Sequence, residues 1–140
     1  MTFLLDTNVV SELRRKRSEP AVFAWTAAQG AATLFLSVVT IMEIELGILC
    51  IGRRDPAQAG RLRRWMTDQV LASFAGRVLP VDIEVAQRCA RLHVPDPRPE
   101  RDAMIAATAL VHGLTMVTRN TADFAATGVV LLNPWLPAAQ

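Results

Sequence analysis

The stretch that decides the fold is RDAMIAATALVHGLTMVTRNTADF, residues 101–124. Its alanine-rich run from about Asp102 to His112 is typical of a helix, and Gly113 is a residue that often ends one. The apolar strand pattern LTMVT follows, and a short turn then leads to Asp123. One aspartate therefore begins the helix that precedes a strand, and a second lies just beyond that strand.

The rest of the chain repeats this alternation of strands and helices. Strands are predicted within residues 2–5, 32–40, 76–82, 114–118 and 128–132, and helices over 7–17, 19–29, 41–50, 57–75, 82–93 and 102–112. This order predicts right-handed crossovers and an α/β fold with a central parallel sheet of about four to five strands, covered by helices on both faces. Ligands of such sheets bind beyond the carboxyl ends of the strands.

Length and composition indicate one domain over residues 1–140, because 51% hydrophobic residues suffice for one sizeable core. No apolar run approaches the roughly 18 residues that cross a bilayer, and the first charges follow the apolar start, the reverse of a signal peptide. We therefore expect a cytoplasmic protein with no membrane partner. Cys50 and Cys89 are expected to be buried as small hydrophobic side chains.

The basic residues are almost all arginine and are clustered. The clusters are RRKR at 14–17, RR at 53–54 and RLRR at 61–64. Because the planar guanidinium group suits two-point contact with phosphate, the clusters indicate a nucleic-acid partner. Each cluster has the alternative interpretation of a solvated helix face.

Acidic residues lie at several strand ends. Asp6 follows the first predicted strand, Glu43 lies in the first turn after the second, and Asp123 follows the strand LTMVT. Since the carboxyl ends of parallel strands share one edge, these three side chains should converge there. Asp102 precedes its strand by a helix, and it reaches the same edge because that helix runs antiparallel to the strands.

Helix capping is the alternative explanation for each acid. Thr40 and Glu43 fit a capping box, Asp6 can cap the helix that follows it, and Asp102 and Asp123 suit the positive end of a helix dipole. Together, however, four like charges at one edge repel each other unless a cation lies between them. Ligands that are all oxygen favour Mg²⁺ or Mn²⁺, and no Cys/His cluster supports zinc.

A carboxylate-held metal suits phosphodiester hydrolysis, because it activates water and offsets charge on the phosphate. His93 and His112 lie at predicted helix ends and are given no catalytic role.

Three blocks in this order resemble PIN-domain nucleases, specifically the VapC and FitB type of toxin from toxin–antitoxin pairs. The blocks are FLLDTNVVSEL at 3–13, LSVVTIMEIELG at 36–47 and RDAMIAATALVHGLTMVTRNTADF at 101–124. The resemblance implies that Asp6, Glu43, Asp102 and Asp123 are the catalytic, metal-binding acids. It also places Asn8, Thr118 and Asn120 at supporting positions.

The same resemblance implies a PIN-like three-layer fold and cleavage of RNA that depends on Mg²⁺ or Mn²⁺. It further implies a homodimer that a small antitoxin inhibits. Arg119 lies beside the predicted site and is a candidate for holding a substrate phosphate. Whether Glu45, Asp96 or Glu100 reaches the site is left open.

Two other classes of protein share part of this pattern. A haloacid-dehalogenase-like phosphatase also places an aspartate after its first strand, but it needs a second aspartate two residues later, where this chain has Asn8. A non-catalytic, RNA- or protein-binding PIN-like module, or a receiver-like module, could carry the same acids without turnover. The sequence names neither the RNA target nor the antitoxin.

Overall fold

The computed structural model describes residues 1–137 and contains one parallel sheet with strand order β3-β2-β1-β4-β5. The strands are β1 (Phe3–Leu5), β2 (Leu34–Ser37), β3 (Val78–Leu79), β4 (Thr115–Val117) and β5 (Leu131–Leu132). Every neighbouring pair is parallel, so each connection must cross over a face of the sheet. The predicted parallel α/β architecture is confirmed.

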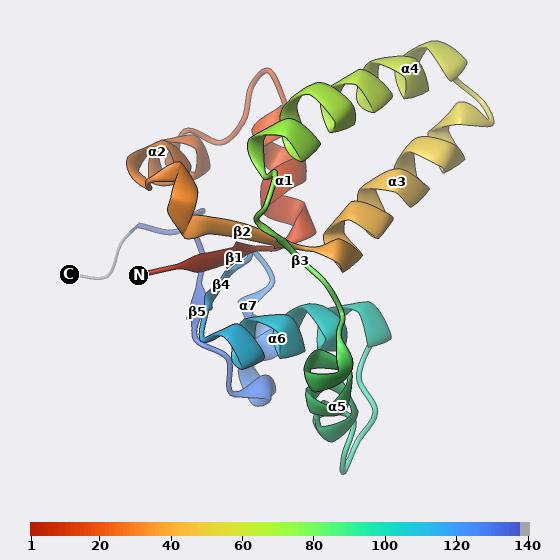
Figure 1. Ribbon diagram of the computed structural model, residues 1–140. Helices are drawn as coiled ribbons and strands as arrows, with labels where there is room; N and C mark the ends of the chain where they lie inside the picture. Colours follow the sequence, from red (N-terminus) through yellow and green to blue (C-terminus); the bar gives the residue numbers. More distant parts are fainter. Residues whose placement is uncertain (138–140) are drawn as a thin grey trace.

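Helices cover both faces of this sheet (Figure 1). They are α1 (Thr7–Arg14), α2 (Pro20–Ala28), α3 (Val38–Gly52), α4 (Pro56–Trp65), α5 (Ile83–Leu92), α6 (Glu100–His112) and α7 (Thr121–Phe124). Three short helical turns are η1 (Ala31–Thr33), the π-turn η2 (Met66–Leu71) and η3 (Ala125–Thr127). In Figure 1, α1 to α4 lie on one side of the sheet, and α5 and α6 lie on the other.

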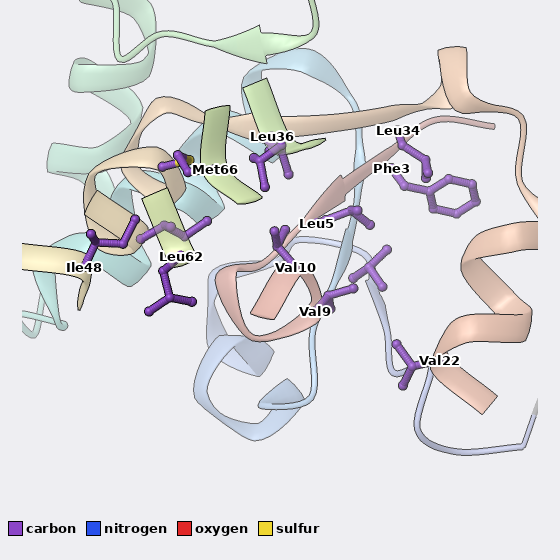
Figure 2. Packing of buried hydrophobic residues seen from close by; sticks show 13 residues of the cluster. Phe3, Leu5, Val9, Val10, Val22, Leu34, Leu36, Ile48, Leu62 and Met66 are labelled. Carbon is purple, nitrogen blue, oxygen red and sulfur yellow. The ribbon is translucent and has the colours of Figure 1, made fainter. Parts of the chain in front are cut away.

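Side-chain alternation along β1 explains the three layers. Leu5 points into a core cluster with Val10 of α1, Leu62 of α4 and Met66, and Figure 2 shows this packing. Leu4, the neighbouring residue, belongs instead to the second cluster, which contains the α6 residues Ile105 and Ala106 together with Phe124 of α7. Successive residues of a strand face opposite sides of the sheet, so a continuous apolar strand serves both layers.

The register of the central strands positions the edge where the acids lie. Leu5 is paired with Val117, and the backbone N–H of Asp6 then donates to the carbonyl of Val117 at 2.9 Å. The next residues on the two strands, Asp6 and Thr118, therefore leave the sheet side by side.

Two predicted boundaries change near the second strand. The strand ends at Ser37, whose hydroxyl accepts from the Val39 N–H at 3.0 Å and so caps α3. The capping box of Thr40 and Glu43 is therefore wrong, because Thr40 is a fully buried residue inside the helix. The residues 38–40 are β-branched and favour a strand locally, but tertiary packing places them in a helix.

Other predicted helix ends hold more closely. Asp82 caps α5 through the Val85 N–H, and Gly113 ends α6 in the left-handed conformation at φ 66°. The cysteine prediction is wrong: Cys50 is exposed and Cys89 is half-buried. Cys50 lies on the side of α3 away from its buried residues Ile44 and Ile48. Within residues 1–137, no helix combines the length and the apolar character needed to span a membrane.

Candidate functional site: a carboxylate cluster at the strand ends

Asp6 is the buried centre of the candidate site. Its side chain, only 6% exposed, is fixed through both carboxylate oxygens. Oδ1 accepts from the Thr7 N–H at 2.8 Å and caps α1, while Oδ2 accepts from the Thr118 hydroxyl at 2.8 Å and from Asn8 Nδ2 at 3.4 Å. Burial raises the pKa of Asp6, the hydrogen bonds from Thr118 and Thr7 oppose that shift, and the negative charges of nearby carboxylates add to it.

Thr118 ties the ends of β1 and β4 together. Its hydroxyl is fully buried, donates to Asp6 and accepts from Asn8 Nδ2 at 3.3 Å and from the Asn120 N–H at 3.0 Å. Asn8 in turn accepts from the backbone N–H of Arg119 at 3.4 Å. Asn8 and Thr118 thus act through side chains, whereas Asn120 contributes its backbone and makes no capping bond to α7 with its side chain.

Glu43 reaches the same edge from α3. Its Oε1 accepts from the Thr7 hydroxyl at 2.7 Å, and its Oε2 lies 3.8 Å from Nη1 of Arg101, the residue before Asp102. Thr7 also lies 3.0 Å from the Thr40 hydroxyl. Thr7 is not among the site residues predicted from the sequence, where its only signal is its position directly after Asp6.

Asp102 and Asp123 complete the cluster from the first turns of α6 and α7. The pKa of Asp102 is raised by partial burial, and further by the negative charges of Glu43 and Asp123. The charges of Asp102 and Glu43 raise the pKa of Asp6 in the same direction. Asp6, Glu43 and Asp102 therefore lie within electrostatic reach of one another, and Asp123 lies within reach of Asp102.

The positive charge at this cluster is small. Among the described residues, the ion pair of Arg101 with Glu43 is the only one that involves a member of the cluster. The ligand atoms are all oxygens and their negative charge is only partly balanced, so a hard divalent cation matches them. No three Asp, Glu, His or Cys side chains of residues 1–137 are grouped closely enough to hold one ion by themselves. The arrangement suits an ion held by one or two carboxylates and completed by water, which is common for Mg²⁺.

The acids whose role was left open face elsewhere. Glu45 pairs with Arg63 of α4 and so lies along the α3–α4 contact. Burial raises the pKa of the Cys89 thiol most, and the negative charge of Glu100 raises it further. Glu100 therefore lies near Cys89 of α5. Asp96 is exposed in the loop before α6.

Arg119 stands at the rim of the site rather than within the cluster. Its guanidinium carbon lies 5.3 Å from the centre of the Trp135 ring, a cation–π contact. The backbone N–H of Arg119 joins the Asn8–Thr118 network, so the residue lies next to the cluster, and its contact with a substrate phosphate stays a prediction.

Comparison with known proteins assigns this chain to a family. The sequence model of the PIN domain matches residues 3–130, a span that contains all four acids. The chain belongs to the PIN-domain family. It is 39% identical to the VapC ribonuclease Y4jK of Sinorhizobium fredii, over 96% of this chain and 99% of that protein.

A second relative of this PIN domain is the toxin FitB of Neisseria gonorrhoeae, 36% identical over 94% of this chain and 97% of the toxin. The crystal structure of FitAcB from the same organism superposes with a TM-score of 0.88 at 34% identity, covering 96% of this chain and 99% of that one. The expected PIN-like three-layer fold is therefore confirmed, and the resemblance to VapC and FitB holds over almost the whole chain.

Proposed function

We propose that this PIN domain is a metal-dependent endoribonuclease that acts as the toxin of a toxin–antitoxin pair. The observation that carries the proposal is the set of carboxylates at the strand ends: Asp6 is buried, its pKa is raised further by the charges of Asp102 and Glu43, and that of Asp102 by Glu43 and Asp123. Relatives that match nearly full length bear the names VapC ribonuclease and toxin FitB, which supports the same activity here. The reaction is hydrolysis: water adds across a phosphodiester P–O bond of RNA.

The acids that would form the metal site are Asp6, Glu43, Asp102 and Asp123, of which one or two would bind Mg²⁺ or Mn²⁺ directly and water would complete the coordination. When bound, such an ion supplies Lewis acidity, which activates water and offsets the charge that develops on the phosphate. The protein contributes orientation. Thr7, Asn8 and Thr118 fix both oxygens of Asp6, and Thr7 and Arg101 fix those of Glu43.

We also propose a homodimer, on the support of an apolar stripe along α3. Val38, Met42, Leu46 and Leu49 recur at helical spacing, and they are 41%, 46%, 41% and 57% exposed. An exposed stripe of this kind is typical of an interface between chains. Sedimentation of wild type against Leu49→Glu tests it: the wild type should be a dimer and the variant a monomer, and a monomeric wild type would remove the proposal.

A cognate antitoxin is the second partner that we propose. The solved structures similar to this chain include a toxin–antitoxin complex from Klebsiella pneumoniae, at 27% identity and a TM-score of 0.69. Expression of the protein alone should then slow growth, and co-expression of the protein encoded in the adjacent reading frame should relieve the arrest. A variant that lacks nuclease activity but remains equally toxic would contradict the toxin role.

Cleavage of labelled RNA tests the enzymatic proposal directly. Wild type should cut RNA in Mg²⁺ or Mn²⁺ and not in chelator, and Asp102→Asn should be inactive. Asp55→Asn is the matched control, because Asp55 caps α4 through the Gln58 N–H at the far tip of the α3–α4 pair (Figure 1). A folded wild type that binds RNA without cutting it would favour the non-catalytic alternative.

A further inference from the structure

Two neighbouring depressions lie on the surface beside α1, and the smaller one reaches Glu43. The smaller, of about 180 Å³, adjoins the carboxylate cluster and is lined by Thr7, Ser11, Arg14, Glu43, Gly47 and Trp65 among others. The larger, of about 500 Å³, lies between the end of α1 and α4, and its lining includes Arg14, Lys16, Gln58, Arg61, Trp65 and Gln69. Both are lined by Arg14, Leu62 and Trp65, so they are adjacent, and we call the two together the α1–α4 groove.

The far end of the α1–α4 groove is positively charged. Arg14, Lys16 and Arg61 are exposed, and within the described part of the chain none of them forms an ion pair with an acid. The dipole of α1 favours basic residues at its carboxyl end, which explains Arg14 and Lys16. It does not explain Arg61, which reaches the same groove from another helix.

The arginines of the RLRR cluster divide between two faces of α4. Arg61 lines the α1–α4 groove, whereas Arg63 lies on the side of α3 and pairs with Glu45. The substitution of the whole cluster would therefore mix two roles. Only Arg61 of these two is placed to contact a ligand in the groove.

Trp65 gives the groove a flat aromatic surface next to the charges. Its ring packs partly on the core, and the guanidinium carbon of Arg14 lies 6.0 Å from its centre. Aromatic faces bind unstacked bases of any sequence, and neighbouring arginines bind the backbone phosphates. This combination of a ring and unpaired cations is typical of single-stranded nucleic-acid sites.

The length of the groove fits several nucleotides. Thr7 and Arg14 stand at opposite ends of α1, which puts them about 10 Å apart along the helix axis. That separation corresponds to about three stacked nucleotides at roughly 3.4 Å each. A chain with its scissile phosphate at the carboxylates would therefore place its neighbouring nucleotides over Trp65 and its next phosphates at the cations.

We propose that the α1–α4 groove binds the single-stranded RNA that flanks the cleaved bond, with Arg14, Lys16 and Arg61 on phosphates and a base stacked on Trp65. This inference rests on the proposed ribonuclease function and extends it to the path of the substrate. Binding is measured in chelator, where no cleavage is needed, so the groove and the nuclease activity are tested separately.

The first test removes charge. Arg14, Lys16 and Arg61 are all changed to Gln, and the control changes the exposed Arg53, Arg54 and Arg91 to Gln, with the same loss of charge. The affinity for a labelled single-stranded oligonucleotide is measured against salt. The groove variant should reduce the slope of log K against log salt by about 2, from roughly 0.7 for each of three phosphates, and the control should bind like wild type.

The second test blocks the groove without a change of charge. A Cβ added at Gly47 meets no atom within 4 Å, and Gly47 lines the smaller depression, so Gly47→Leu adds its side chain on the side of the groove. Gly60→Leu is the matched control, since it is also in a helix and also open, but it lines the opposite side of α4. The affinity for RNA should fall only in Gly47→Leu.

The third test addresses stacking. Trp65→Leu should weaken RNA binding about 5- to 150-fold, the range for loss of one stacked base. Trp65→Phe should keep most of the affinity, because it keeps an aromatic face. Equal RNA affinity in groove and control variants would overturn the proposal. Loss of antitoxin binding alone would do the same, because it would assign the groove to a protein segment.

Discussion

Substitution of Asp102 by Asn separates a metal-site role from a helix-end role most cleanly. Partial burial and the charges of Glu43 and Asp123 all raise the pKa of Asp102, and no hydrogen bond opposes them. Asp6 is a poorer choice, because Thr118, Asn8 and Thr7 donate to its carboxylate and an amide would disrupt that network. At position 102 the amide keeps the shape and removes the repulsion.

The expected magnitudes have opposite signs with and without metal. Without metal, relief of repulsion from the neighbouring acids Asp6, Glu43 and Asp123 should stabilise Asp102→Asn by about 0.5 to 1 kcal/mol, the scale of exposed charge pairs. With Mg²⁺ at a hundredfold excess over its dissociation constant, wild type should gain about 2.7 kcal/mol. That gain corresponds to a rise in Tm of roughly 10 °C for a chain of this size.

Thermal melts of wild type, Asp102→Asn and the capping control Asp55→Asn, each with and without Mg²⁺, measure these terms. The metal-induced rise should be full in wild type and Asp55→Asn and much smaller in Asp102→Asn. If Asp102 serves only the dipole of α6, its substitution should lower the stability of the metal-free protein by up to about 1 kcal/mol. Equal metal-induced shifts in all three proteins would refute the metal site.

Three further predictions follow from single contacts. Burial raises the pKa of Asp6 above its ordinary 3.8, so ionisation of Asp6 destabilises the folded state. As the pH falls from 7 toward about 4, the stability of the metal-free wild type should therefore rise relative to that of Asp6→Asn. Over the same range the Mg²⁺-induced rise in the Tm of wild type should become smaller. Thr118→Val should cost about 2 to 3 kcal/mol in denaturant melts, because a buried carboxylate loses its hydroxyl donor, and Thr118→Ser should restore most of it. Gly47→Ala should stabilise the protein by about 0.8 to 1 kcal/mol, whereas Gly113→Ala, at φ 66°, should destabilise it in the same calorimetric assay.

The parts of the site that sequence could predict are those fixed by topology. Once the strands are known to be parallel, Asp6 and Asp123 must leave them at one edge, and the antiparallel course of α6 brings Asp102 to the same place. These inferences need only the order of the elements. Glu43 was also placed correctly at this edge, although its predicted cap was wrong, because a shift of the helix start by three residues leaves it on the first two turns of α3.

The parts that sequence could not predict depend on contacts between distant segments. The bond from Thr7 to Glu43 joins residues 36 positions apart, and no local pattern marks either residue as the partner of the other. The division of Arg61 from Arg63 depends on how α4 packs against α1 and α3. The sequence also did not mark Trp65 as a residue of the groove, because a tryptophan at a helix end is usually part of a core.

The two carboxylate oxygens of Asp6 contact different parts of the chain. Oδ1 faces the start of α1, and Oδ2 faces Thr118 and Asn8. The donors lower the pKa of Asp6 against the effect of burial, which helps to keep the carboxylate ionised, and they fix its orientation without a cation. The folded chain thus carries the cost of a buried negative charge beside other carboxylates. A cation that binds only the folded state would relieve that cost, so the residue that destabilises the metal-free cluster most should contribute most to metal affinity.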